Sequence, residues 1–148
     1  MKRIESFNVD HTKLEPGFYV SRIDGDITTY DMRAIKPNTT PLLTNSEMHS
    51  FEHMFTTIIR NGSMSEKIIY FGPMGCQTGF YLCVRNSDNV QTVAEVEKTL
   101  NDILEHNGEM FGNSEIECGN YRSLDINNAK KVAKNYLNVF NGLNVYEK

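Results

Sequence analysis

The stretch EMHSFEHMF (residues 47–55) places His49 and His53 four residues apart, with Glu52 directly before the second histidine. Helical side chains at this spacing lie on one face, so both imidazoles can reach a single point in space. Neutral imidazole is a suitable ligand for Zn²⁺ or Fe²⁺. Glu52 lies nearer the apolar stripe of the helix, where partial burial would raise the pKa of its carboxyl and let it take and return protons. The stretch predicts a metal site, although two solvated histidines would give the same spacing.

A metal held by two histidines needs at least one more protein donor, and Cys118 in EIECGNY is the candidate. We expect Cys118 at the end of a short strand, with Gly119 letting the chain turn away. A His49, His53 and Cys118 set would leave a fourth position open, which is typical of catalytic zinc sites. The alternative is that Cys118 is simply a buried cysteine.

A second thiol, Cys76, follows Gly75 in FGPMGCQTGF, between two expected strands. Backbone amides or a nearby metal cation at such a turn would favour the reactive thiolate. The alternative is a turn cysteine without a role. Cys83 alternates within a strand and is expected to pack as a small apolar residue.

The elements that would position these residues follow from hydrophobic periodicity and turn signals. GFYVSRIDGDITTYDMRAI alternates on both sides of Asp24-Gly25, which predicts a β-hairpin. Thr44 and Glu47 fit a capping box, so we expect a helix over residues 45–60 that carries both histidines. The other expected elements are strands at KIIYF, GFYLCVR and EIEC, a helix over residues 90–104 that Gly108 ends, and a helix from near Asp125 to Phe140, before Gly142.

Composition and element order set the class of protein. At 148 residues, 39% hydrophobic and 23% charged, the chain is expected to form one domain, residues 1–148. Strand pairs with interspersed helices predict an α+β fold, in which an antiparallel β-sheet carries helices packed on one face as a two-layer sandwich. The net charge of −4 gives no footprint for nucleic acid, and no apolar run is long enough to span a membrane. The start of the chain lacks the apolar core of a signal peptide, and three cysteines make no disulfide framework, so we expect a cytoplasmic protein.

Five motifs together resemble the S-ribosylhomocysteine lyase (LuxS) family, which makes the precursor of autoinducer-2. They are IESFNVDH, YDMR, HSFEH, GPMGCQTGFYL and ECGNYR, in the family's order and over nearly the whole chain. The resemblance implies a homodimer with two active sites at the subunit interface, each completed by the N-terminal segment of the partner. The implied substrate is the small molecule S-ribosylhomocysteine, with no nucleic acid or membrane as partner.

The resemblance also implies roles for individual residues. His49, His53 and Cys118 would bind the metal, which is Fe(II) in the cell, with Zn(II) or Co(II) as substitutes. Cys76 and Glu52 would be the two proton carriers. The substrate contacts would come from Ser6, Phe7, His11 and Arg33.

One position departs from the family pattern. Many members carry an acidic residue and a serine just before Pro-Met-Gly-Cys, whereas this chain has Tyr70, Phe71 and Gly72 there. The residues that the resemblance makes proton carriers are retained, and the departure bears on one polar substrate contact.

The implied reaction cleaves S-ribosylhomocysteine to homocysteine and 4,5-dihydroxy-2,3-pentanedione, which links the methyl cycle to quorum sensing. The metal would act as a Lewis acid on the sugar carbonyl. Cys76 would move protons between neighbouring carbons until the ketone reaches C-3, and Glu52 would then take the C-4 proton so that homocysteine leaves from C-5 by β-elimination. No redox step occurs, and the chain has no dinucleotide-binding fingerprint after a strand.

Two other functions fit part of the pattern. The sequence H-x-x-E-H also occurs in inverted zinc peptidases, in which Glu52 would be the base for a metal-bound water and Glu95 or Glu97 would be tried as third ligand. A non-enzymatic module stabilised by a metal is the other, with Cys76 or His11 closing the fourth position.

Overall fold

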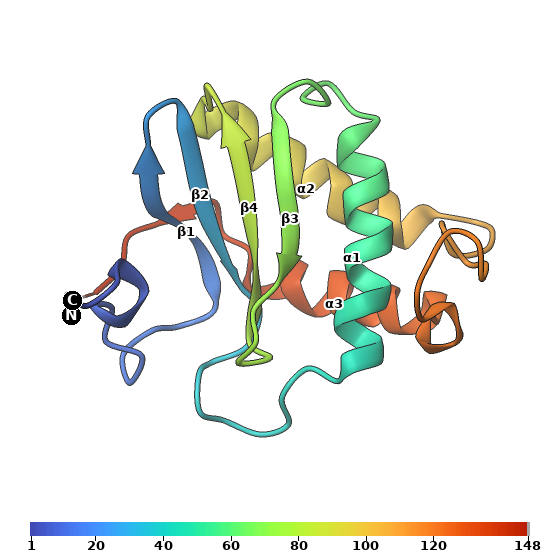
Figure 1. The fold of residues 1–148 in the computed structure, drawn as a ribbon, viewed down its shortest axis with the longest axis horizontal. Helices are drawn as coiled ribbons and strands as arrows, with labels where there is room; N and C mark the ends of the chain where they lie inside the picture. The colour runs from blue at the N-terminus through green and yellow to red at the C-terminus, as the bar shows by residue number, and fades with distance from the viewer. Residues whose placement is uncertain (148) are drawn as a thin grey trace.

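The computed structural model describes residues 1–147 as a five-stranded sheet with three helices packed on one of its faces (Figure 1). The strand order is β3-β4-β2-β1-β5. The predicted α+β class is confirmed. In chain order the elements are η1 (Glu5–Phe7), β1 (Gly17–Asp24), β2 (Ile27–Arg33), α1 (Asn45–Arg60), β3 (Ile68–Pro73), β4 (Gly79–Arg85), α2 (Asn89–Glu105), η2 (Tyr121–Ser123), α3 (Ile126–Val139) and β5 (Leu143–Asn144).

The four long strands pair antiparallel, as the sequence predicts. β1 and β2 form the expected hairpin about Asp24-Gly25, and Gly25 adopts the positive φ that such a turn needs. β4 pairs with both β2 and β3. The short β5 was not expected, and it pairs parallel with β1, so the sheet is mixed. Two residues carry no alternation signal, which is why β5 is invisible in the sequence.

Helix α1 begins and ends where the sequence predicts. The Glu47 N–H donates to Thr44 Oγ1 at 3.1 Å, and the Thr44 N–H donates to Glu47 Oε1 at 3.0 Å, which completes the capping box. The helix ends at Arg60 with Asn61 as its cap. Both boundaries of the predicted helix are therefore confirmed.

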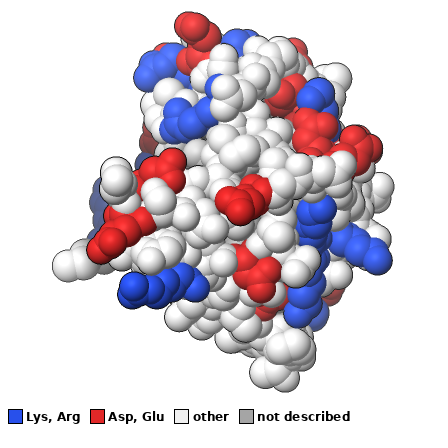
Figure 2. All heavy atoms as spheres, turned by 90° about the vertical axis from the view of Figure 1, so that its right-hand side faces the viewer, with Lys and Arg blue, Asp and Glu red and all other residues white. Residues whose placement is uncertain are grey.

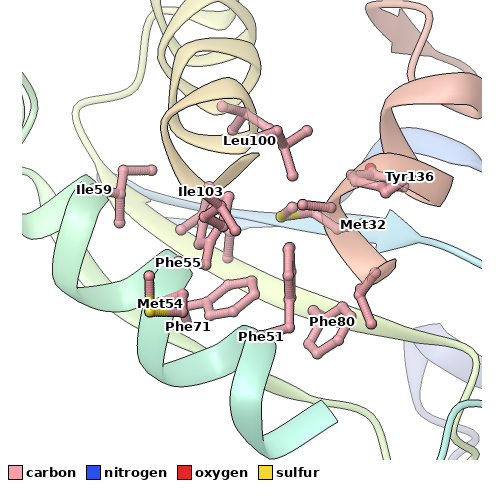
Figure 3. Close-up of a cluster of buried hydrophobic side chains, with 14 of the residues drawn as sticks. Met32, Phe51, Met54, Phe55, Ile59, Phe71, Phe80, Leu100, Ile103 and Tyr136 are labelled. Atoms are coloured by element: carbon pink, nitrogen blue, oxygen red, sulfur yellow. The ribbon is translucent and has the colours of Figure 1, made fainter. Parts of the chain in front are cut away.

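The buried face of α1 packs on the sheet through an aromatic cluster (Figure 3). The ring centroids of Phe55 and Phe71 are 4.3 Å apart, and those of Phe51 and Phe80 are 4.8 Å apart. Burying each such side chain contributes about 1.5–3 kcal/mol. The cluster therefore fixes the rotation of α1 about its axis, and with it the direction in which the histidines point.

One expected strand and one expected helix stop were wrong. The EIEC segment is a turn rather than a strand, because the N–H groups of Glu117 and Cys118 both donate to Ser114 O, at 3.2 and 3.0 Å. Ile116 in the middle of the segment is 98% exposed, so no apolar contact favours an extended chain. Helix α2 ends at Glu105, three residues before Gly108, and His106 is its C-cap.

The two faces of the sheet have different environments. Tyr30 and Met32 of β2 belong to the core beneath the helices. Side chains alternate along a strand, so Asp31 and Arg33 point to the opposite, helix-free face. Over residues 1–147, none of the helices combines the length and the apolar character needed to cross a bilayer.

Candidate active site

The structure brings His49, His53 and Cys118 together. The ligand atoms of the three side chains all lie within 4.8 Å of one another, and Cys118 Sγ is 3.4 Å from His49 Nε2. The two imidazole rings are 4.6 Å apart at right angles. α1 supplies the histidines, and the turn after Ser114 supplies the sulfur. The turn thus does the positioning that a strand end was expected to do.

Hydrogen bonds on the far side of each ring fix the imidazoles. His53 Nδ1 lies 2.9 Å from Phe111 O, a carbonyl that can only accept, so Nδ1 carries the proton. His49 Nδ1 lies 2.6 Å from Ser123 Oγ, whose own hydroxyl donates to Asn120 O at 3.1 Å. Both Nε2 atoms are therefore left with a lone pair that faces Cys118.

The electrostatics favour the ligand form of the histidines. Burial lowers the pKa of His49, and a proton on nearby His53 would lower it further, so the His49 ring is neutral near pH 7. The Asn120 N–H donates to Cys118 Sγ at 3.4 Å, which stabilises a thiolate. Two imidazole nitrogens and one sulfur make a donor set that suits Zn²⁺ or Fe²⁺. The residues fit a metal ion.

Gly112 and Ser123 were not singled out from the sequence. Gly112 has a φ of +68°, and a Cβ there would lie 3.0 Å from His53 Nδ1, so the backbone beside the ring requires glycine. Neither residue carries a recognisable local signal, because each acts through a contact with a distant part of the chain.

Replacing Ser123 with alanine is expected to weaken metal binding by about 10–100-fold, because His49 loses the acceptor that orients its ring. Competition between the protein and a chromogenic chelator for Zn²⁺ measures this. Ser65→Ala is the matched control, since Ser65 is exposed and its side chain makes no hydrogen bond among residues 1–147. Equal affinities in the two variants would exclude the orienting role.

Glu52 lies beside His53 on the same helix. Burial raises the pKa of its carboxyl, and the charge of His53 opposes this. Glu52, His53, Thr56 and Thr57 line a cavity of about 230 Å³. Thr56 Oγ1 is buried and makes no hydrogen bond within residues 1–147. A carboxyl with a raised pKa beside a metal site is suited to proton transfer.

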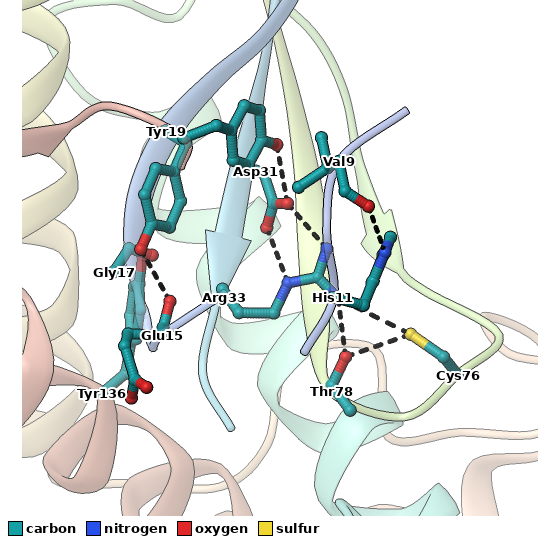
Figure 4. Close-up of polar contacts among 11 residues, drawn as sticks. Val9, His11, Glu15, Gly17, Tyr19, Asp31, Arg33, Cys76, Thr78 and Tyr136 are labelled. Carbon is teal, nitrogen blue, oxygen red and sulfur yellow. Dashed lines mark hydrogen bonds and ion pairs between the residues drawn. The ribbon is translucent and has the colours of Figure 1, made fainter. Parts of the chain in front are cut away.

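Cys76 lies in the turn between β3 and β4, in a second cluster (Figure 4). Its Sγ is 3.0 Å from Thr78 Oγ1 and 3.8 Å from Arg33 Nη1, and Arg33 Nη1 donates to Thr78 Oγ1 at 2.7 Å. Cys76, Thr78 and His11 line one cavity of about 530 Å³. An exposed thiol beside a guanidinium is suited to reaction as a thiolate.

The remaining predicted substrate contacts lie at the start of the chain. Ser6 and Phe7 belong to η1, and Phe7 is 61% exposed. His11 Nδ1 is 2.9 Å from Val9 O. Of the four predicted contacts, His11 lines the cavity of Cys76, and Arg33 is buried beside it with Nη1 in contact with Cys76 Sγ.

The metal cluster and the Cys76 cluster do not meet within one chain. The first lies in the helix layer, and Arg33 of the second points from the helix-free face of the sheet. η1 lies at one end of the long axis of the molecule, and the loop that follows α2 and carries Cys118 lies at the other (Figure 1). No hydrogen bond or ion pair within residues 1–147 joins the two clusters.

The departure at residues 70–72 also has a structural counterpart. A Cβ at Gly72 would lie 1.9 Å from Tyr70 Oη, so the Tyr70 side chain covers the place where a longer residue 72 would stand. Gly72 pairs with Tyr81 of β4. The tyrosine and the glycine are therefore structurally coupled.

The third ligands considered for a peptidase lie elsewhere. Glu95 accepts a hydrogen bond from Ser63 Oγ at 2.8 Å, and Glu97 is exposed on α2. Figure 2 shows the face that lies at the right of Figure 1: acidic side chains stand within a largely uncharged area, and Lys and Arg lie towards its edges. Neither glutamate belongs to the group formed by His49, His53 and Cys118.

Comparison with protein families matches residues 4–145 to the family described as S-Ribosylhomocysteinase (LuxS). The S-ribosylhomocysteine lyase of Finegoldia magna is 40% identical over 97% of this chain and 94% of its own length. The lyase of Borreliella burgdorferi is 40% identical over 97% of this chain and 95% of its own, and that of Clostridium acetobutylicum is 45% identical over 86% and 83%. The similarity thus extends over most of the length of each pair.

Proposed function

The chain belongs to the S-ribosylhomocysteinase (LuxS) family and is a lyase, and we propose that its substrate is S-ribosylhomocysteine. The products would be homocysteine and 4,5-dihydroxy-2,3-pentanedione, which is the precursor of autoinducer-2. The observation that carries the proposal is the family match over residues 4–145, in a chain whose two clusters supply the donors and proton carriers the reaction needs. The products would serve the methyl cycle and quorum sensing. Free Cys76 and Cys118 favour the reducing cytoplasm as the place of action.

The metal would be held by Nε2 of His49, Nε2 of His53 and Sγ of Cys118. Fe(II) is the ion proposed for the cell, with Zn(II) or Co(II) as substitutes, because all three accept nitrogen and sulfur donors. When bound, the ion supplies Lewis acidity at the oxygens of the sugar. Ser123 and Phe111 hold the rings in place, and Asn120 supports the sulfur.

The protein's own groups would move the protons. Cys76 as thiolate takes the proton from C-2 of the open-chain sugar and returns it at C-1, which converts the aldehyde to a C-2 ketone. A second transfer from C-3 to C-2 brings the ketone to C-3. Arg33 and Thr78, which both contact Cys76 Sγ, stabilise the thiolate between transfers.

Glu52 would then take the proton from C-4. The electrons of that C–H bond form the C-4–C-5 double bond, and the C-5–S bond breaks so that homocysteine leaves as a thiolate, which is protonated to the thiol. The raised pKa of Glu52, caused by burial, suits this exchange, because it makes the carboxylate a better proton acceptor. The enol that remains tautomerises to the pentanedione.

We propose a homodimer whose two active sites each combine the metal cluster and Glu52 of one chain with Cys76, Arg33 and His11 of the other. The separation of the two clusters on opposite sides of the sheet supports this arrangement, because one substrate must reach both. A two-fold interface would form two identical sites. The helix-free sheet face also exposes the large side chain of Tyr70, which a partner would cover.

The test mixes metal-loaded protein with S-ribosylhomocysteine and measures homocysteine by mass spectrometry. We expect release with the metal-loaded protein, almost none after treatment with a chelator, and recovery when Fe(II) or Zn(II) is returned. No release from the loaded protein would overturn the proposed reaction. Full release after verified removal of the metal would instead overturn only the metal dependence.

The same samples test the two other functions. Hydrolysis of casein without release of homocysteine would indicate a metallopeptidase. X-ray absorption showing four protein donors to the metal would indicate a closed structural site. Cys76 and His11 both lie at the second cluster, so neither can supply that fourth donor from within the same chain.

A further inference from the structure

We propose that Tyr146, close to the C-terminus, is a positioning residue for Cys76 and acts through Asp31 and Arg33. The Tyr146 hydroxyl donates to Asp31 Oδ2 at 2.7 Å. Asp31 accepts from Arg33 Nε at 3.1 Å and from Arg33 Nη2 at 2.6 Å. Arg33 Nη1 then reaches Thr78 and Cys76. The inference rests on the role proposed for Cys76.

The middle of this chain of contacts is a buried ion pair. Asp31 is 1% exposed and Arg33 is 3% exposed. A buried carboxylate is costly unless its oxygens accept several hydrogen bonds, and the tyrosine hydroxyl supplies the bond that the arginine cannot. Burial, followed by the negative charge of Asp31, raises the pKa of Tyr146 far above its usual value, so the hydroxyl stays protonated and donates.

The geometry of arginine carries the effect onward. The guanidinium is planar and rigid, so fixing Nε and Nη2 on Asp31 also fixes the direction of Nη1 (Figure 4). Nη1 is the atom that contacts both Thr78 Oγ1 and Cys76 Sγ. A change in the carboxylate's orientation therefore moves the positive charge relative to the thiol.

The C-terminal segment holds Tyr146 in place. β5 pairs parallel with β1 through Leu143 and Asn144, and Asn144 precedes Tyr146 by two residues. The Tyr146 ring stacks on Tyr19 of β1, with centroids 4.8 Å apart and planes within 9°. The Tyr19 hydroxyl donates to Glu15 O at 2.7 Å, away from Asp31, so the stack rests on the two rings and not on this hydroxyl. The stack fixes the position of the Tyr146 ring, and Asp31 accepts the hydrogen bond from the Tyr146 hydroxyl.

The experiment compares Tyr146→Phe with Tyr19→Phe in the full-length, metal-loaded protein. Each variant removes one hydroxyl from the same stacked pair, but only the first removes a donor to Asp31. For Tyr146→Phe we expect the rate of Cys76 alkylation by iodoacetamide, read by mass spectrometry on the peptide that carries Cys76, to fall about three- to tenfold, and kcat to fall by a similar factor. Tyr19→Phe is expected to keep both rates near those of the unsubstituted protein.

A purely structural role would lower the Tm of Tyr146→Phe without changing the alkylation rate, and that result would overturn the inference. Equal alkylation rates in the two variants would overturn it as well. If the unsubstituted protein released no homocysteine, the proposed function would fail, whereas the alkylation rates would still decide whether Tyr146 positions the charge beside Cys76.

Discussion

Cys76→Ala is expected to lower kcat for homocysteine release by about 10²–10⁴-fold, because the thiolate proposed to move protons along the sugar is lost. Cys76 is exposed in a turn and contributes nothing to the core. The free energy of unfolding should therefore change by no more than about 0.5 kcal/mol. Mass spectrometry of the product and urea unfolding measure the two quantities on the same sample.

Cys83→Ala is the matched control for this substitution. Cys83 is half-buried on β4, where its Sγ lies 3.5 Å from Thr29 Oγ1 and touches neither cluster. Its loss should spare kcat. If Cys76→Ala kept a kcat close to that of Cys83→Ala, the role assigned to Cys76 would be wrong.

Two inactive variants, His53→Ala and Cys76→Ala, are expected to restore activity to each other when their dimers are mixed. The first removes a proposed metal ligand, and the second removes the thiol from the other cluster. In a mixed dimer, one site receives its metal cluster from one variant and its Cys76 cluster from the other, so it is intact. Random exchange of subunits should give about a quarter of the activity of the unsubstituted protein, since half the dimers are mixed and each has one good site of two.

Mixing His53→Ala with His49→Ala is the control, because both substitutions damage the same cluster and no pairing yields an intact site. Native mass spectrometry verifies that subunits have exchanged. A Cys76→Ala and His53→Ala mixture that exchanges fully but stays inactive would show that the site does not combine these clusters from two chains.

The parts of the fold that depend on neighbouring residues could be predicted from the sequence. The capping box of Thr44 and Glu47 and the stop at Asn61 set both ends of α1. Asp24-Gly25 set the first hairpin. Such signals are local, because the hydrogen bonds that satisfy a helix end or a tight turn come from residues a few positions away.

The parts that depend on distant residues could not be predicted. The turn that carries Cys118 has an alternating pattern, but the N–H groups of Glu117 and Cys118 donate to Ser114 within the turn rather than to a strand. Nothing near Tyr146 in the sequence points to Asp31, 115 residues away. Asp31 itself had a usable signal, since residues two apart in a strand share a face and Asp31 precedes Arg33 by two. Opposite charges at that spacing are enough to predict an ion pair between the two side chains.

The three candidate metal ligands were proposed from spacing and from family motifs, whereas the residues that hold their side chains in place were not. Ser123, Phe111 and Gly112 act on α1 from the loop that follows α2, and their residue types are common in any loop. Their importance arises only when the chain has folded and the ring nitrogens need partners.

The sheet that separates the two clusters also keeps the nucleophilic sulfur of Cys76 away from the metal ion proposed to bind at the other cluster. If they met in a newly made subunit, Cys76 could occupy the coordination position that the sugar requires. In the proposed dimer, Cys76 of one subunit approaches the metal of the other subunit only after the two have assembled. Dimer formation would then keep the fourth coordination position open for the sugar.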